Sequence, residues 1–387
     1  MAARNAYWRF GDDPGHRRFI STGALDLESG EKLSELTIAY ETWGDFTGDN
    51  AVLVEHALTG DSHVTGSAGP GHPTAGWWDD LVGPGRGLDT NRWFVVATNV
   101  LGGCQGTTGP SSPAPDGAAY GSRFPYLTVR DQVSAEVAVA DALGIDRWAL
   151  VIGGSMGGMR ALEWAVTHPE RVSRLAVVAS TAAASAEQIG LCSTQIHAIR
   201  ADPAWRGGDY YDAGSEESAT GDSFAGSPVG GRALGPIAGL GIARRIAHIS
   251  YRSEFELAAR FGREPQDDGR PWIGSGRYAV ESYLDHHADK LAARFDAGSY
   301  VTLSESMNSH DVGRDRGGIA AALATVTAST LVVAVDSDRL YPTSQQAEIA
   351  ARIPGASYRE IASRYGHDGF LIETEQVGVH LAGFLAS

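Results

Sequence analysis

The sequence contains little cysteine, no cluster of basic residues and no long unbroken apolar segment. Its 387 residues include only two cysteines, Cys104 and Cys192, which excludes a disulfide framework and is typical of a reducing compartment. Because the formal net charge is −16 and no Lys/Arg-rich run offsets it, we expect no binding to nucleic acid. A site for an anionic ligand would need its own local positive charge.

We expect neither secretion nor membrane insertion. The first residues, MAARNAYWRFGDDPGHRRF, include no apolar stretch of the kind that a secretory signal needs. The longest apolar-looking stretch, residues 318–335, is interrupted by four Thr and Ser residues between 325 and 330. An alanine-rich helix that runs into a buried strand explains it better than a membrane span. The predicted location is the cytoplasm.

The chain is long enough and apolar enough to bury a large core. Hydrophobic residues make up 43% of it and charged residues 20%, so most of it should be folded rather than disordered. Length alone would allow about two or three domains. The order of the predicted elements favours instead one large domain that carries an insertion.

Several short apolar runs predict strands that are buried on both faces of a sheet. They are residues 36–42, 51–55, 93–98, 148–153, 174–179 and 331–335. Helical patterns alternate with the later runs, at 156–166 and 343–352. A further helix is predicted after the candidate N-cap Thr128, because Val129, Val133 and Val137 recur on one helical face. This alternation predicts an α/β fold with a mostly parallel central sheet and helices on both faces.

The alternation stops after about residue 180 and resumes near residue 317. The segment between contains helical stretches at 186–200 and 240–261. Between these stretches, residues 207–231 are rich in Gly, Ser and Asp and predict a mobile loop. We interpret the middle segment as a helical lid over an active site. The predicted division is a catalytic core of residues 1–181 and 317–387, and a mainly helical lid insertion of residues 182–316.

The central functional signal is a serine between two glycines. Ser155 lies between Gly153 and Gly157 in the pattern G-x-S-x-G, directly after a predicted strand and before a predicted helix. This context is typical of a nucleophile elbow. The turn is so tight that its flanking positions must be small, and it lifts the serine hydroxyl above the sheet. Ser155 is therefore the predicted nucleophile.

A serine hydroxyl becomes a good nucleophile only with a general base, and the base needs an acid to orient it. In enzymes with a nucleophile elbow, the acid follows the serine along the chain and the histidine follows the acid. Asp336 and Asp338 both follow the predicted strand 331–335, at the sheet edge where sites form. Asp338 lies further into the loop and is better able to reach a histidine, so we assign it as the acid, with Asp336 as the alternative.

His367 is the predicted base, because it lies in a polar loop after the acid and before the last helical pattern. His310 is a rival, but it precedes the strand that carries the acid and would break the chain order. His286 and His287 are adjacent on a helix and cannot face the same way. Ligand spacing of the zinc type is absent, so we expect no metal site.

An oxyanion hole needs two backbone N–H groups directed at one point. One should come from the residue after the nucleophile, Met156. The other should come from the loop after an early strand, and Leu58 lies in the loop that follows strand 51–55. Leu58 and Met156 are therefore the predicted oxyanion donors.

Several blocks of the sequence resemble homoserine O-acetyltransferases, a family of the α/β-hydrolase superfamily. The longest are HALTGDSH at 56–63, GWWD at 76–79 with LVGPG at 81–85, and NVLGGCQGTTGPSS at 99–112. Further matches occur at 153–159, 310–312, 337–342 and 365–371. The resemblance extends from about residue 36 to residue 384. Independent blocks in the same order make it more specific than any single motif.

The resemblance implies an α/β-hydrolase fold and a cytoplasmic homodimer that acts on the route to methionine. It implies L-homoserine as acceptor and acetyl-CoA as a donor substrate, with no permanently bound cofactor. The implied triad is Ser155, Asp338 and His367. The implied acceptor-binding residues are Thr59, Arg244, Tyr251 and Asp368. Arg244 would bind the homoserine carboxylate, with its neighbour Arg245 as the alternative for this role. Asp368 would bind the ammonium group of homoserine.

Rival functions remain at this point. A serine esterase or other hydrolase would use the same triad with water as the acceptor. A related transferase would use succinyl-CoA as donor, or serine as acceptor, because one methylene changes binding by only about 1–3 kcal/mol. A binding protein without activity would need a broken triad, whereas here Ser, Asp and His all follow in order.

Overall fold

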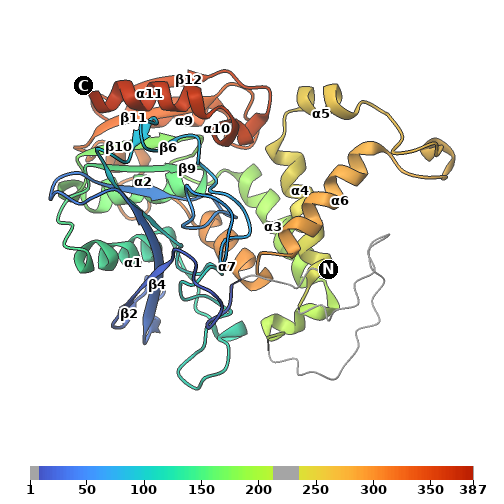
Figure 1. Cartoon of the computed structure of the whole chain (residues 1–387), viewed down its shortest axis with the longest axis horizontal. Helices are drawn as coiled ribbons and strands as arrows, with labels where there is room; N and C mark the ends of the chain where they lie inside the picture. Colours follow the sequence, from blue (N-terminus) through green and yellow to red (C-terminus); the bar gives the residue numbers. More distant parts are fainter. Residues whose placement is uncertain (1–7, 212–234, 387) are drawn as a thin grey trace.

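The computed structural model describes residues 8–211 and 235–386. At its centre is a mostly parallel sheet (Figure 1). Its strands are β1 (Arg18–Thr22), β4 (Leu36–Trp43), β5 (Ala51–Glu55), β8 (Phe94–Thr98), β9 (Leu150–Gly154), β10 (Arg174–Val178), β11 (Ser329–Val335) and β12 (Ser357–Ile361). Their order is β1-β4-β8-β5-β9-β10-β11-β12. The pairs β1–β4 and β4–β8 are antiparallel, and the other neighbouring pairs are parallel. This architecture confirms the predicted fold class.

Helices pack on both faces of this sheet. They are α1 (Val129–Ala142), α2 (Met156–Thr167), α9 (Thr343–Arg352), α10 (Gly369–Ile372) and α11 (Thr374–Ala386). On β5, Leu53 belongs to the core that includes α1, α2 and α9, whereas Val52 and Val54 belong to the core that includes α10 and α11. Successive side chains of a strand point to opposite faces, so an unbroken apolar run fills both cores at once.

The six predicted strands all form, and their ends lie within about two residues of the expected positions. Thr128 caps α1 as predicted, in a capping box with Asp131. Of the eight strands in this sheet, sequence reasoning missed β1 and β12, which lie at its two edges. β12 reads SYREI and exposes Arg359 and Glu360, so it lacks the apolar run that marks a buried strand.

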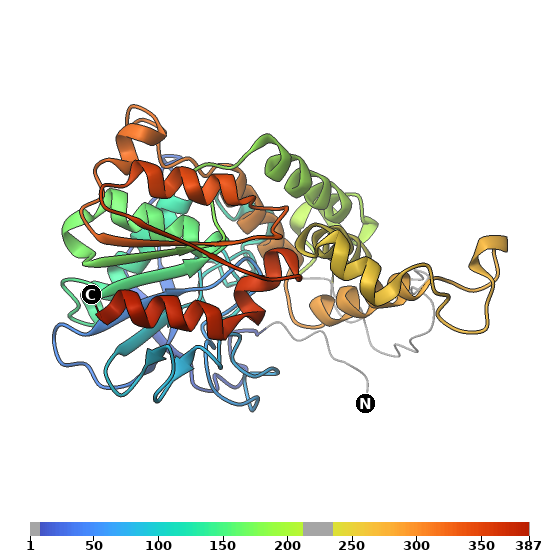
Figure 2. The same ribbon diagram turned by 90° about the horizontal axis from the view of Figure 1, so that it is seen from above.

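The segment between β10 and β11 carries the helices that lie beside the sheet rather than on its faces (Figure 2). They are α3 (Ala186–Arg200), α4 (Ile237–Tyr251), α5 (Glu254–Phe261), α6 (Ala279–Ala292) and α7 (Ala297–Asn308). The predicted single helical stretch 240–261 was wrong, because Arg252 is extended and Ser253 caps a new helix. Most of the predicted loop 207–231 lies outside the described residues.

The apolar stretch 318–335 contains a short helix, α8 (Ile319–Leu323), and then β11, as predicted. Among residues 8–211 and 235–386, no helix has the length and apolar character needed to cross a membrane.

Candidate active site

Ser155 occupies a strained turn between β9 and α2. Its φ is 56° and its ψ is −124°, a conformation that residues other than glycine rarely adopt. Glycine is required at the neighbouring positions, because any side chain there would clash with the backbone. A Cβ on Gly153 would lie 2.2 Å from the backbone of Gly157, and one on Gly157 would lie 2.1 Å from the carbonyl oxygen of Glu55. The observed turn therefore has the geometry of a nucleophile elbow.

The structure joins Ser155, His367 and Asp338 in one chain of hydrogen bonds. His367 Nε2 lies 2.9 Å from Ser155 Oγ, and His367 Nδ1 lies 2.6 Å from Asp338 Oδ2. The other oxygen of Asp338 accepts the backbone N–H groups of Leu340 and Tyr341, at 2.8 and 2.9 Å. Both carboxylate oxygens are thus engaged, which holds the acid in one orientation toward the imidazole.

Electrostatics suit His367 to accept a proton. Burial alone would lower its pKa, but the charge of Asp338 and the hydrogen bond to it outweigh burial, and the pKa of His367 is raised. A raised pKa means a stronger base toward the serine hydroxyl. Tyr341, which sequence reasoning had not singled out, packs beside the imidazole with ring centroids 5.0 Å apart.

The rival acid and the rival base make other contacts. Asp336 is exposed, and its Oδ1 accepts the N–H of Ser363 at 2.9 Å. His310 is buried, and its Nε2 pairs with the carbonyl oxygen of Thr181 at 3.0 Å. Neither side chain belongs to the chain of hydrogen bonds at Ser155.

The two predicted oxyanion donors lie just beyond the ends of adjacent parallel strands. Leu58 follows β5, and Met156 opens α2 directly after β9. Both residues are buried, yet neither N–H donates a hydrogen bond within the described ranges 8–211 and 235–386. A backbone N–H that has no acceptor in the protein is free to donate to a ligand oxygen, as an oxyanion donor must.

Arg244 lies beside the triad with nitrogen atoms left unpaired. Its guanidinium carbon is 5.7 Å from the centre of the Tyr251 ring, which lies 5.8 Å from the ring of His367. Within residues 8–211 and 235–386, the Nε and one Nη of Arg244 are buried without a hydrogen-bond partner. The neighbouring Arg245 instead pairs with Asp285. Of the two adjacent arginines, Arg244 is therefore the one available to an anionic group.

Asp368 and Thr59 also lie at the site, and each has a partner that sequence reasoning missed. The Nε of Arg252 lies 3.2 Å from Asp368 Oδ2, and an Nη of Arg294 donates to the carbonyl oxygen of Thr59 at 2.9 Å. Burial raises the pKa of Asp368, although Arg252 opposes this. Arg252 directly follows Tyr251 in the sequence, but adjacency alone did not indicate its partner.

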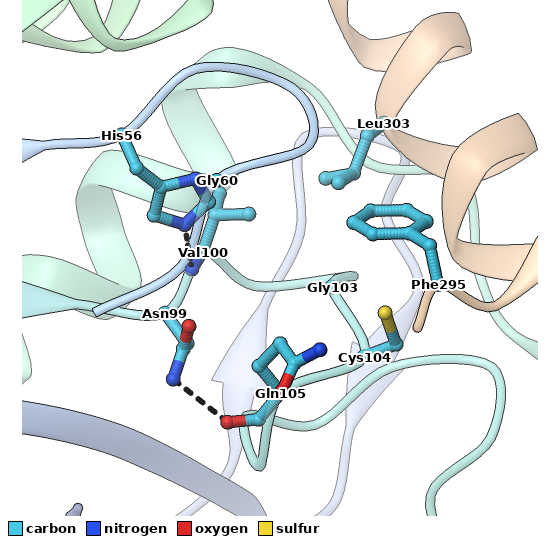
Figure 3. Close-up of a pocket in the computed structure, with 9 residues that line it drawn as sticks. All are labelled: His56, Gly60, Asn99, Val100, Gly103, Cys104, Gln105, Phe295 and Leu303. Atoms are coloured by element: carbon cyan, nitrogen blue, oxygen red, sulfur yellow. Dashed lines mark hydrogen bonds between the residues drawn. The ribbon is translucent and has the colours of Figure 1, made fainter. Parts of the chain in front are cut away.

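A small pocket lies beside the loop that runs from His56 to Gly60 (Figure 3). Its lining comprises His56, Gly60, Asn99, Val100, Gly103, Cys104, Gln105, Phe295 and Leu303. Neither Ser155 nor His367 is among these residues. Burial raises the pKa of the Cys104 thiol, so it is protonated near neutral pH and is a poor nucleophile. The pocket therefore adjoins the oxyanion loop without adding a second reactive group.

One group of side chains within the described residues brings metal-binding atoms together. Glu41, His63 and His72 place such atoms within 4.8 Å of one another. The rings of His63 and His72 are stacked, with centroids 3.9 Å apart and planes inclined by 15°. An ion bound to an imidazole lies in the plane of that ring, so two stacked rings cannot both bind one ion as they stand. A hydrogen bond of 3.0 Å between His63 and Glu41 explains the group instead.

Comparisons with known proteins agree with this geometry. The family model of the α/β hydrolase fold matches residues 50–374. The chain is 59% identical over 383 residues to the homoserine O-acetyltransferase of Thermobifida fusca (strain YX), covering 98% of this chain and 96% of that protein.

Two solved structures show the same fold. The homoserine O-acetyltransferase from Bacillus anthracis has a TM-score of 0.83 at 24% identity, covering 96% of this chain and 97% of its own. An acetylester hydrolase from Corynebacterium glutamicum has a TM-score of 0.78 at 25% identity, with 97% of each chain covered.

Fold and site together define an enzyme of the α/β hydrolase fold with a serine at its nucleophile elbow. Within that class, the chain belongs to the homoserine O-acetyltransferase family of acyltransferases. The family resemblance of the sequence blocks is thereby confirmed.

Proposed function

We propose that the protein transfers an acetyl group from acetyl-CoA to the side-chain hydroxyl of L-homoserine through an acetyl-Ser155 intermediate. The observation that carries the proposal is the guanidinium of Arg244 beside the triad, two of whose nitrogens are buried without a partner among the described residues. Such a cation needs an anion, and an amino acid supplies a carboxylate there. The name of the Thermobifida fusca relative supports acetyl as the group and homoserine as the acceptor.

In the first half of the proposed reaction, His367 Nε2 takes the proton of Ser155 as Oγ attacks the thioester carbonyl of acetyl-CoA. The negative charge that develops on the carbonyl oxygen is stabilised by the N–H groups of Leu58 and Met156. The C–S bond then breaks, His367 returns its proton to the sulfur, and CoA leaves. Asp338 holds the imidazole in the required tautomer and stabilises its charged form.

In the second half, the hydroxyl of homoserine attacks the acetyl-Ser155 ester. His367 takes the hydroxyl proton and passes it to Ser155 Oγ as the ester bond breaks. Arg244 binds the substrate carboxylate, and Asp368 faces the ammonium group, with Tyr251 and Thr59 beside them. Because CoA leaves before homoserine reacts, the proposal requires ping-pong kinetics. Acetyl-CoA is a substrate, and no permanently bound cofactor takes part.

A hydrolase is the second candidate, because an acetylester hydrolase shares the fold at a TM-score of 0.78. Water would then take the place of homoserine in the second half of the reaction. Arg244 argues against it, because hydrolysis of a simple acetyl ester uses no carboxylate at this position.

We also propose a homodimer in the cytoplasm that binds neither membrane nor nucleic acid, in keeping with the family resemblance and the net charge of −16.

The proposal predicts CoA release that depends on the acceptor. Purified protein mixed with acetyl-CoA should release about one CoA per active site in a burst, and sustained release should begin only when L-homoserine is added. L-serine as acceptor and succinyl-CoA as donor should give slower turnover. Sustained release without any amino acid would make water the acceptor and overturn the proposal in favour of a hydrolase.

Arg244 and Arg245 provide a matched pair for testing the carboxylate site. Arg244→Lys keeps the charge but loses the planar fork, and should raise KM for homoserine by about 10- to 100-fold with a smaller change in kcat. Arg245→Lys alters only the pairing with Asp285 and should leave KM within about twofold. Steady-state kinetics at saturating acetyl-CoA measures both. Equal effects of the two substitutions would refute the assignment.

A further inference from the structure

The peptide that carries the Leu58 N–H is held from its opposite side by a histidine. His56 Nδ1 lies 2.7 Å from the carbonyl oxygen of Ala57, and the N–H of Gly60 donates to the same oxygen at 2.9 Å. The backbone N–H of Val100 donates to His56 Nε2 at 3.1 Å (Figure 3). His56 thus bridges the loop after β5 and the loop after β8.

These contacts determine the tautomer of His56. A nitrogen that accepts a hydrogen bond carries no proton, so the Val100 N–H requires an unprotonated Nε2. The proton of the neutral ring is therefore on Nδ1, and it is donated to Ala57. Burial, and secondarily the charge of Arg160, lowers the pKa of His56 to about 3, so the ring is neutral near pH 7.

The hydrogen bond to Ala57 also sets the direction of an oxyanion donor. The carbonyl of Ala57 and the N–H of Leu58 belong to one planar trans peptide and point in opposite directions. Holding the carbonyl oxygen on one side therefore directs the N–H to the other. The second donor has the same arrangement: the hydroxyl of Ser180 donates at 2.7 Å to the carbonyl oxygen of Ser155, whose peptide carries the Met156 N–H.

Arg160 connects the two halves of this arrangement. It is fully buried on α2, the helix that Met156 opens, and one Nη donates to the carbonyl oxygen of His56 at 2.9 Å. The other Nη donates to Glu136 at 2.6 Å, which fixes the guanidinium. The loop of one oxyanion donor is thereby attached to the helix of the other.

We propose that His56 is a positioning residue for the oxyanion hole, and that it acts by donating its Nδ1 proton to Ala57 and so directing the N–H of Leu58. The inference rests on the proposed acyl-serine function only in that Leu58 N–H must stabilise an oxyanion. The choice of donor and acceptor does not enter it, so a simple ester tests it even if acetyl-CoA or homoserine is the wrong substrate.

The test compares two substitutions that each keep one half of the imidazole. The amide N–H of asparagine takes the place of Nδ1, so His56→Asn keeps a donor to Ala57 and loses the contact with Val100. The longer glutamine amide reaches the place of Nε2, so His56→Gln keeps the contact with Val100 and loses the donor to Ala57. Acylation is followed with p-nitrophenyl acetate and with acetyl-CoA, and melting temperatures report folding.

We expect His56→Asn to retain kcat within about threefold. We expect His56→Gln to lose about 10- to 100-fold in kcat on both donors, with little change in KM. The loss is smaller than that for removal of a whole oxyanion donor, which lowers the rate by a factor on the order of 10²–10³. Equal losses in both variants, or loss in His56→Asn alone, would show that His56 only supports the fold and would overturn the proposal. Should a variant not fold, neutron diffraction of the unmodified enzyme decides: a proton on Nδ1 supports the proposal, and one on Nε2 overturns it. Loss of homoserine dependence with an intact difference between the variants would overturn the acceptor assignment alone.

Discussion

Replacement of Ser155 by alanine is expected to lower kcat for acetyl transfer by a factor on the order of 10⁴–10⁶. The reason is that, in the proposed reaction, Ser155 Oγ forms the bond to the acyl carbon. Without this hydroxyl, which lies 2.9 Å from His367 Nε2, the imidazole has no proton to accept. The oxyanion donors and the substrate site remain, so binding of acetyl-CoA and homoserine should change little. The loss should therefore appear in kcat rather than in KM.

Rapid-quench mass spectrometry measures this directly. The unmodified enzyme mixed with acetyl-CoA alone should gain the mass of one acetyl group, located on the peptide that contains Ser155. The Ser155→Ala variant should gain none. That variant would keep the strained backbone of the elbow, so its melting temperature should stay close to that of the unmodified enzyme, which separates loss of chemistry from loss of fold. An acetyl group found on another residue, with activity retained, would assign the nucleophile elsewhere.

Much of the fold could be predicted from sequence because its central strands are apolar along most of their length. β5, at Ala51–Glu55, and α9, at Thr343–Arg352, have the predicted ends. The edge strand β12 could not be recognised, because a strand exposed on one side needs no apolar run. The break at Arg252 was also hidden, since α4 and α5 on either side of it both read as helix.

The residues of the candidate site likewise divide into those that the sequence predicts and those that it does not. Chain order and the elbow motif were enough to bring forward Ser155, Asp338 and His367, because Ser155 and Asp338 each follow a recognisable strand and His367 follows the acid along the chain. The contacts of Arg252 with Asp368 and of Val100 with His56 join residues 116 and 44 positions apart, and no local pattern indicates such pairings. The unpaired state of Arg244 is likewise a property of its surroundings, since Arg245 has the same chemistry one residue away.

The second large effect is expected at Asp338, and its magnitude follows from the contacts of both carboxylate oxygens. Leu340 and Tyr341 donate their N–H groups to Oδ1, so in Asp338→Asn the amide oxygen must stay at that position and the NH₂ group must face His367. Nδ1 of His367 must then accept a hydrogen bond, which moves its proton to Nε2. An Nε2 that carries a proton cannot take one from Ser155, and kcat should fall by a factor on the order of 10⁴.

Asp336 supplies the matched control two residues away. Its Oδ1 accepts the N–H of Ser363, and an asparagine oxygen can do the same, so Asp336→Asn should change kcat by less than about twofold. Pre-steady-state acylation by acetyl-CoA, measured across pH for both variants, separates the two aspartates. If Asp336→Asn were the inactive variant, the acid would be Asp336 and His367 would have to change its partner. If neither variant lost activity, the hydrogen bond of 2.6 Å between Asp338 and His367 would have no part in activating the serine.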